Sequence, residues 1–590
     1  MDNNEERAAG EGADNQRKKR NLGRSEWSRQ NLDKRARNEE LKEAKRRKIE
    51  EGQEVSEPIY ATHFSQEDIE SEQRRPKKKV AVLLGYSGTG YHGMQLCDKQ
   101  TISTIEGELF AAFVAAGAIS KANAADPKKS SLVRCARTDK GVHAAGNIVS
   151  LKMIVEDPDV VQKINEKLSS QIRIWDIQVT NKGFSCYQMC DSRVYEYLIP
   201  SHCFVPPHPS TYLGRKIVEL AEKEGDLEQF KARQKEVATY WSDVDEQYIK
   251  PILDNVPEDI RKLVQKALYL GEEQGESLEE DEPQESEKPT ESAAAPAGDG
   301  ATASEEKPAE TEQPTKVDWR ESLPEDQRRE MYETIKAIKA AYLKAKRTYR
   351  IPAARLARVQ EGLDKYIGTK NFFNYTIQKM HNDPSAKRHI KSFKVHPTPI
   401  IINGTEWLSM KVHGQSFMMH QIRKMVAMMT MVVRCGCDPE RIVETYGATK
   451  IAIPKAPGLG LLLERPVFET FNKKVSTLGK KPIDFDNYKK EIDEFKQREI
   501  YDRIFREEEE TNAFSSFFNH IDNFPQEEFL FVTSGGIPAA KPTTQPTTPP
   551  REQSRRASAQ KGRISQREAL ATVESESEDE RIPDNGEEGG

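Results

Sequence analysis

The chain has 590 residues, of which 36% are hydrophobic and 32% are charged. This length exceeds the roughly 100–200 residues of one domain, and the high charged fraction predicts that part of the chain cannot bury enough apolar surface to fold. No stretch approaches 18 consecutive apolar residues and the first residues are polar, so we expect neither a transmembrane span nor a secretory signal. Seven cysteines without a C-x-x-C pair argue against a disulfide framework and favour a reducing compartment.

The net charge of −6 conceals an uneven distribution. Residues 271–315 contain fifteen acidic residues and two lysines, and residues 572–590 contain eight acidic residues and one arginine. These two segments together carry −20, which leaves +14 on the remainder of the chain. A cationic remainder favours a polyanionic partner, and bulk charge does not specify which one.

Residues 1–76 are charged, poor in apolar residues and without sustained periodicity, so they are predicted to be a disordered arm. Basic runs at 17–20, 45–48 and 74–79 lie in or beside this arm. Any single run is equally well explained as a solvated tail, but three together favour a nuclear protein that uses the import machinery or contacts nucleic acid.

The first predicted strand is the apolar run 80–84, followed by a glycine-rich loop and a helix that opens with the capping box of residues 103–106 and ends near Gly117. Within the loop, Gly88 to Gly93 match the dinucleotide-binding pattern G-x-G-x-x-G. The helix begins about ten residues too late for that site, and no acidic residue occurs around Phe113. A tight glycine turn is therefore the preferred interpretation.

Strands are next expected at 132–136 and 147–155, with the polar loop 137–143 between them. Asp139 in this loop is bracketed by Arg137 and Lys140. Asp and Gly in a loop usually mark a plain turn. However, apolar strands on both sides anchor the loop, and nearby cations are expected to lower the pKa of an aspartate that must stay ionised to act as a nucleophile.

Strands at 172–179 and 193–199 follow, and alternation in the second places Arg193, Tyr195 and Tyr197 on one face. That face suits a stacked base and a phosphate, although half-buried strand tyrosines explain it equally well. Later in the chain, Arg423 lies on an otherwise apolar helix predicted at 419–434. A buried arginine usually needs a carboxylate partner, and Asp139 is the candidate.

The remaining elements complete an α/β pattern. Helices are predicted in 214–270, 325–346, 353–365 and 484–510, and strands at 389–395, 400–402 and 406–412. The predicted organisation is a disordered arm 1–76, an N-terminal catalytic subdomain 77–215, a helical segment 216–270, an acidic insertion 271–316, a C-terminal catalytic subdomain 317–475, a helical extension 476–533 and a disordered tail 534–590.

Five fragments together resemble the TruA-type tRNA pseudouridine synthases, in particular their eukaryotic nuclear branch. In chain order they are Y-S-G-T-G-Y-H-G-M-Q at 86–95, R-T-D-K-G-V-H-A at 137–144, R-V-Y-E-Y at 193–197, F-M-M-H-Q-I-R-K-M-V at 417–426 and A-P-G-L-G-L-L-L at 456–463. The resemblance covers about residues 77–215 and 365–468. No single fragment is specific, but the combination is.

The resemblance implies two α+β subdomains whose antiparallel sheets join around a catalytic cleft, and conversion of uridine to pseudouridine without a cofactor. It makes Asp139 the essential carboxylate, which either attacks C1′ or removes the 2′ proton. Arg137 and Arg423 would hold that carboxylate, and Tyr195 would stack on the uracil that is swung out of the RNA at a cost of a few kcal/mol. The implied substrate-binding residues are Tyr195, Thr138, Lys140, His143, Arg193, His420 and Gln421.

The implied partner is tRNA, with small nuclear RNA and mRNA as further candidates, and the chain would be a nuclear monomer or weak dimer. Where bacterial members carry a basic residue before the R-x-Y-x-Y motif, this chain has Cys186-Tyr187-Gln188, so a phosphate contact there is not carried over. The cysteine spacing does not support a metal site. Two alternatives remain at this stage: a non-catalytic RNA-binding scaffold on the same fold, and a base-exchanging transglycosylase.

Overall fold

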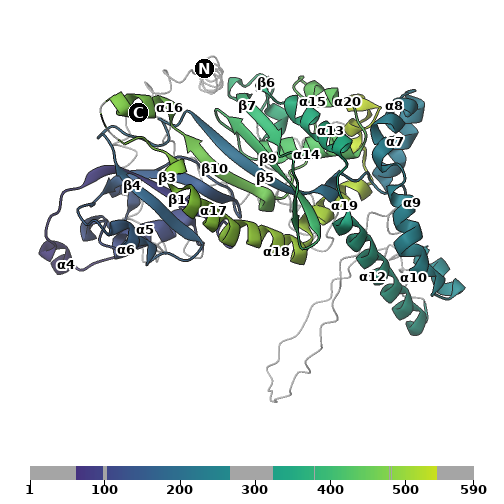
Figure 1. The fold of residues 1–590 in the computed structure, drawn as a ribbon, viewed down its shortest axis with the longest axis horizontal. Helices are drawn as coiled ribbons and strands as arrows, with labels where there is room; N and C mark the ends of the chain where they lie inside the picture. The colour runs from purple at the N-terminus through teal and green to yellow at the C-terminus, as the bar shows by residue number, and fades with distance from the viewer. Residues whose placement is uncertain are drawn as a thin grey trace, which may run out of the picture. The chain divides into compact units, whose positions relative to one another are not determined.

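A single mixed sheet forms the framework of the protein (Figure 1). The computed structural model describes residues 62–96, 102–265, 323–377, 379–477, 479 and 481–540. The main strand order is β4-β1-β3-β10-β5-β9-β7-β6, with β2 paired to β3 and β8 paired to β9. Neighbouring strands are antiparallel except β10 and β3, which are parallel. The predicted α/β class, with antiparallel sheets joined into one surface, is confirmed.

The strands are β1 Lys78–Tyr86, β2 Val133–Arg134, β3 His143–Met153, β4 Ile172–Val179, β5 Ser192–Pro200, β6 Gly368–Asn371, β7 Lys387–Val395, β8 Ile400–Ile402, β9 Thr405–Gly414 and β10 Leu461–Val467. Nearly all residues of β1 and β3 are buried, which explains why β1 contains the continuous apolar run 80–84 rather than an alternating pattern. These two strands hold the predicted catalytic loop from one side.

Several strand boundaries differ from the sequence-based expectation. β3 begins at His143, not near residue 147, and β6 and β10 were not predicted at all. β10 contains Pro466, a residue that is normally excluded from central strands because it cannot donate to the ladder. The pairing of β10 with β3 is confined to Leu462 and Leu463, so Pro466 pairs with β5 alone. Because β5 pairs with both β9 and β10, the two halves of the chain share one sheet.

The main helices are α4 Gln66–Ser71, α5 Ile105–Ala115, α6 Val160–Asn165, α7 Tyr212–Lys223, α8 Leu227–Gln234, α9 Tyr240–Val244, α10 Lys250–Asp254, α12 Glu325–Thr348, α13 Ala353–Asp364, α14 Gln421–Arg434, α15 Glu440–Glu444, α16 Glu469–Thr477, α17 Lys489–Phe495, α18 Asp502–Thr511, α19 Ala513–Asn523 and α20 Gly536–Ala539. The helices predicted at 325–346, 353–365 and 419–434 are confirmed to within a few residues. None of the helices in the described ranges is long and apolar enough to span a bilayer.

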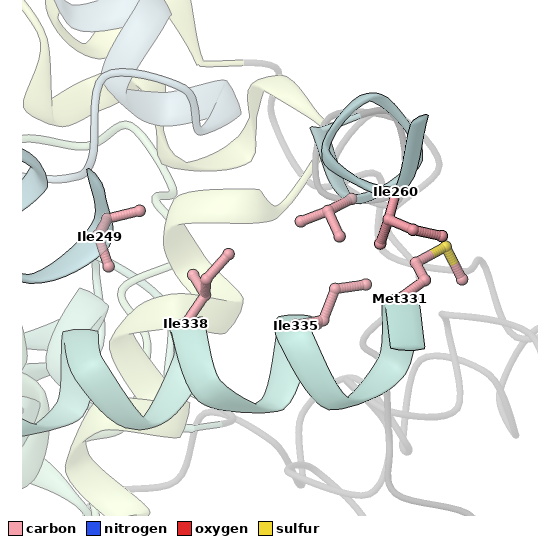
Figure 2. Close-up of a cluster of buried hydrophobic side chains, with 6 residues drawn as sticks. Ile249, Ile260, Met331, Ile335 and Ile338 are labelled. Atoms are coloured by element: carbon pink, nitrogen blue, oxygen red, sulfur yellow. The ribbon is translucent and has the colours of Figure 1, made fainter. Parts of the chain in front are cut away.

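The residues before the acidic insertion pack against α12, which follows it. Their contact is a separate apolar cluster of Ile249, Ile260, Val264, Met331, Ile335 and Ile338 (Figure 2). The three α12 members recur at helical spacing, so one stripe of this otherwise charged helix is apolar. The Tyr342 hydroxyl adds a 2.8 Å hydrogen bond to Asp245. The predicted insertion at 271–316 lies outside the described residues.

The boundary predicted for the disordered arm, residue 76, is too late in the sequence. Helix α4 lies within it, capped by the Ser65 side chain, which accepts from the Asp68 amide at 3.1 Å. The basic run 74–79 is also partly engaged: Arg75 donates to the Gly117 carbonyl at 3.0 Å, and Lys77 donates to the Ser120 hydroxyl at 2.7 Å. The basic runs at 17–20 and 45–48 lie outside the described residues.

The predicted capping box at the start of α5 is also corrected. Thr104, not Ser103, is the N-cap, and its hydroxyl accepts from the Gly107 amide at 3.3 Å. The Glu106 carboxylate does not return to the cap. It is fully buried, accepts from the Leu96 amide at 2.9 Å and pairs with Arg134 at 3.0 Å.

The segment that joins α17 to α18 packs against Glu196, which alternates with Tyr195 along β5 and so lies on the opposite face of the sheet. Between α17 and α18 a π-helical turn places Lys496 between the carboxylates of Glu196 and Glu464, 2.7 Å from each. The Tyr501 hydroxyl donates to Glu196 at 2.7 Å as well. Helices α17, α18 and α19 lie within the predicted helical extension 476–533, and α20 lies beyond it, in the predicted tail.

Candidate functional site

Asp139 lies in the loop between β2 and β3, and its side chain keeps 29% of its exposure. Burial raises the pKa of its carboxyl group, and the positive charges of Arg423 and Lys455 oppose that rise. The imidazole Nε2 of His420 is 3.7 Å from the Asp139 carboxylate. A partly accessible carboxylate is thus surrounded by groups from segments far away in the sequence.

The sequence-based account of Asp139 was wrong in two respects. The pKa of the carboxyl group is raised rather than lowered, because burial outweighs the nearby cations. The cations that act on it are Arg423, which the sequence indicated as its partner, and Lys455, which it did not, whereas Arg137 and Lys140, its neighbours in sequence, are exposed. Adjacent residues in a tight loop point in different directions, so sequence proximity was a poor guide to charge proximity.

The glycine-rich segment after β1 packs against the loop that carries Asp139. A Cβ atom on Gly88 would lie 2.4 Å from the Val142 carbonyl oxygen, and one on Gly93 would lie 2.7 Å from the Thr138 carbonyl oxygen. The Met94 amide donates to that Thr138 carbonyl at 3.1 Å. The glycines therefore serve close backbone packing, as the turn interpretation required, and give no dinucleotide site.

Helix α14 supplies the other wall of the site. Its N-cap His420 has a left-handed backbone with φ 59°. Residues other than glycine rarely adopt this conformation, and it is often found at functional sites. The Gln421 side chain accepts from the Met418 amide at 2.9 Å and so fixes the approach to the helix. Arg423 donates from Nε to the Ala456 carbonyl at 2.6 Å, which aims its guanidinium beside Asp139.

His420 is neutral despite its proximity to a carboxylate. Burial, with the positive charges of Lys455 and Arg423, lowers its pKa to about 3. Its contact with Asp139 is therefore not an ion pair at neutral pH, and the imidazole is available as a neutral donor or acceptor.

Strand β5 provides an aromatic face. The Tyr195 ring meets the Phe417 ring edge-to-face, with centroids 5.3 Å apart. Burial raises the pKa of the Tyr195 hydroxyl, and the negative charge of Asp139 adds to that rise. Arg193 donates to the Cys135 carbonyl at 2.8 Å, and the Tyr197 hydroxyl donates to the Pro457 carbonyl at 2.6 Å. Tyr195 thus lies within range of the charge of the carboxylate, whereas Arg193 and Tyr197, on the same face of the strand, hydrogen-bond to backbone carbonyls.

One of the predicted substrate-binding residues, His143, occupies a position that changes its interpretation, and a second, Thr138, has a fixed partner inside the protein. His143 is completely buried, and its Nδ1 accepts from the Gly88 amide at 3.1 Å, so it supports the glycine segment rather than a substrate. The hydroxyl of Thr138 is bonded to the Tyr86 hydroxyl at 2.8 Å. Asp139, Tyr195, His420 and Arg423 are the predicted residues that the fold brings together.

Sequence reasoning missed several residues around this site. Lys455 immediately precedes the A-P-G-L-G-L motif, and Phe417 begins the motif that contains His420, so both were within reach. Tyr86 opens the motif at 86–95 and was likewise within reach, whereas Asn147, on strand β3, belongs to none of the quoted motifs. Within the described ranges, no three His, Cys, Asp or Glu side chains are grouped as a metal site would require.

Chemically, the arrangement offers an ionisable oxygen nucleophile or base, two cations, a neutral imidazole and an aromatic face. These groups are suited to a reaction at an electron-poor carbon that is bonded to a planar ring, and such a reaction needs no redox group.

Comparison with known proteins agrees with this chemistry. A family profile described as tRNA pseudouridine synthase matches residues 363–469. The chain is 44% identical over 459 residues to tRNA pseudouridine synthase 1 of Eremothecium gossypii, covering 78% of this chain and 76% of that protein. It is 42% identical to the protein of that name from Schizosaccharomyces pombe, over 81% of this chain and 90% of the relative. It is 31% identical to the tRNA pseudouridine(27/28) synthase of Saccharomyces cerevisiae, over 75% of this chain and 98% of the relative.

Proposed function

The chain belongs to the tRNA pseudouridine synthase family, and we propose that Asp139 is the carboxylate on which its isomerisation reaction depends. The enzyme converts uridine in tRNA to pseudouridine. The N1–C1′ bond breaks, the uracil turns, and a C5–C1′ bond forms while the C5 proton moves to N1. Atoms and electrons balance without a co-reactant.

The observation that carries the proposal is the setting of Asp139. Both available routes, attack on C1′ and removal of the 2′ proton, require an ionised carboxylate with access to a ribose. The Asp139 side chain is partly exposed, and Arg423 and Lys455 favour its ionised form against the effect of burial. Tyr195, supported by Phe417, offers the aromatic face for the displaced uracil.

Replacement of the carboxylate is the direct test. Asp139→Ala should abolish pseudouridine formation in purified protein, while tRNA binding stays within about threefold, because the phosphate contacts are made elsewhere on the surface. Asp254→Ala, at an exposed aspartate away from the sheet, is the matched control and should leave turnover unchanged. Substantial turnover by Asp139→Ala would refute the proposal, and mapping of the modified positions distinguishes isomerisation from base exchange.

Arg423 is proposed to orient this carboxylate. Arg423→Ala should lower turnover much more than it weakens tRNA binding, because the guanidinium that faces Asp139 is lost. Arg423→Lys keeps the charge but not the Nε donor to the Ala456 carbonyl, and should recover only part of the rate. A normal rate for the alanine variant with an intact fold would separate Arg423 from the reaction.

We further propose additional RNA substrates, a nuclear location and a monomeric or weakly dimeric state. The cationic remainder of the chain and the basic runs support a nuclear enzyme that also accepts small nuclear RNA and mRNA and enters through the import machinery. Removing the runs at 17–20 and 45–48 from a fluorescent fusion should redistribute it to the cytoplasm. A monomer or weak dimer is expected by light scattering.

A further inference from the structure

A chain of buried hydrogen-bonding side chains leads from the core of the sheet to the loop that carries Asp139. Asn147 on β3 and Tyr86 at the end of β1 are completely buried, and Thr138 is 7% exposed. The Asn147 amide nitrogen is 3.3 Å from the Tyr86 hydroxyl, which is 2.8 Å from the Thr138 hydroxyl. Thr138 directly precedes Asp139.

The direction of donation along this chain is fixed at its inner end. The Ile148 backbone amide, which can only donate, is 2.8 Å from the Asn147 side-chain oxygen. That bond settles which end of the Asn147 amide is oxygen. The nitrogen end must then donate, one hydrogen to the Ala136 carbonyl at 3.1 Å and the other to the Tyr86 hydroxyl.

The Tyr86 hydroxyl both accepts and donates a hydrogen bond. Its oxygen accepts from Asn147, and its own proton needs an acceptor because an unsatisfied buried hydroxyl costs about 1–3 kcal/mol. Among the described residues, Thr138 supplies the acceptor oxygen. Burial also raises the pKa of Tyr86 to about 12, so the phenol keeps the proton that it donates. Thr138 is therefore the acceptor in this bond, and its own hydroxyl proton points elsewhere.

We propose that Asn147 and Tyr86 are positioning residues that commit the Thr138 hydroxyl to donating its proton to an oxygen of the bound uridine. The inference rests on the proposed role of Asp139, whose carboxylate defines where the nucleotide sits. The Thr138 backbone is held as firmly as its side chain, by the Met94 amide at 3.1 Å and the close packing of Gly93. A donor whose direction is set before substrate binds stabilises developing negative charge on an oxygen without reorganising during the reaction.

The first test removes the donor itself. Thr138→Val should lower the turnover number about 100-fold, the usual effect of losing one oriented donor, with KM changed by less than about threefold. Thr138→Ser keeps the hydroxyl and should restore most of the rate. Tyr86→Phe leaves the hydroxyl without its anchor and should lower turnover about 10-fold. In a Thr138→Val background, Tyr86→Phe should have no further effect on turnover, because there is no hydroxyl left to orient.

The second test reverses the direction of donation along the hydrogen bonds that join residue 147, Tyr86 and Thr138. In Asn147→Asp, one carboxylate oxygen still accepts from Ile148, but the other now accepts from Tyr86, which leaves Thr138 to donate backwards to the Tyr86 oxygen. Turnover should fall by about the same factor as in Thr138→Val. In the Tyr86→Phe background, Asn147→Asp should lower turnover no further, since the hydrogen bonds that it would reverse are already broken. A purely structural effect of the aspartate would persist in the Tyr86→Phe background.

The outcomes separate this inference from the assignment of Asp139. If Asp139→Ala is inactive but Thr138→Val turns over at the normal rate, the committed donor is refuted and the catalytic carboxylate stands. If Asp139→Ala remains active, the proposed function fails irrespective of Thr138. If Asn147→Asp does not fold, by thermal unfolding, the Thr138 and Tyr86 cycle decides alone: additive losses of turnover overturn the inference, and non-additive losses support it.

Discussion

Gly88→Ala probes how closely the catalytic loop is packed. Gly88 has no positive φ, so alanine adds no backbone strain, only a methyl group. That Cβ would lie 2.4 Å from the Val142 carbonyl oxygen and 2.7 Å from two neighbouring carbonyl carbons, all of them backbone atoms. Because ordinary contacts begin at 3.4 Å, the end of the loop must retreat by about 1 Å.

A displacement of that size near Asp139 should lower the turnover number about 100-fold, because misplacement of a reacting group by about 1 Å costs roughly that factor. The crowding should also destabilise the protein by about 1–3 kcal/mol. Turnover is measured on excess tRNA by release of the C5 proton of uridine, and folding by thermal unfolding.

The controls separate crowding from other effects of the substitution. Gly183→Ala meets nothing within 4 Å at an ordinary φ and should leave both quantities unchanged. Gly90→Ala also meets nothing within 4 Å but sits at φ +85°, so it should cost stability through backbone strain with little loss of turnover in the folded fraction. A Gly88→Ala protein with normal turnover and normal stability would refute the idea that this contact sets the position of the loop.

Four further outcomes are expected. Asp139→Asn should unfold at a slightly higher temperature than the parent at pH 8, because burial raises the pKa of the carboxyl group and so disfavours its ionised form in the folded state. For the same reason, the acid limb of the pH–rate profile of the parent enzyme should lie above the pKa of an ordinary aspartate. Burial raises the pKa of Glu508 to about 7, so this group should destabilise the fold progressively as pH rises from about 4.5 to 7, by about 1–3 kcal/mol, and thermal unfolding of Glu508→Gln should show a flatter pH dependence over that window. Lys496→Met should cost about 3–5 kcal/mol in urea unfolding, since Glu196 and Glu464 lose the cation they share, and a loss below 1 kcal/mol would contradict that account. Deletion of the low-complexity segment 271–315 should leave turnover on tRNA nearly unchanged, and a large loss would show that it has a working role.

Local sequence determined the elements whose signals are themselves local. The strands at 172–179 and 193–199 and the helix at 419–434 were predicted to within two residues. Side-chain periodicity and apolar runs favour one type of secondary structure over a few consecutive residues, so these signals are local. The loop that carries Asp139 was recognisable from seven consecutive residues, and its resemblance to a family gave the reaction. The start of β3 was misplaced because His143 is polar, although in the fold it is completely buried.

Only the tertiary structure decided the electrostatics of the site. The sign of the pKa change at Asp139 depends on burial by several segments, and of its two cations only Arg423 on α14 was predicted from the sequence, whereas Lys455 on the approach to β10 was not. The orientation of the Thr138 hydroxyl depends on Asn147 and Tyr86, which belong to two different strands. Burial and hydrogen-bond direction are set by groups that meet only after the chain has folded, and a one-dimensional pattern does not contain them.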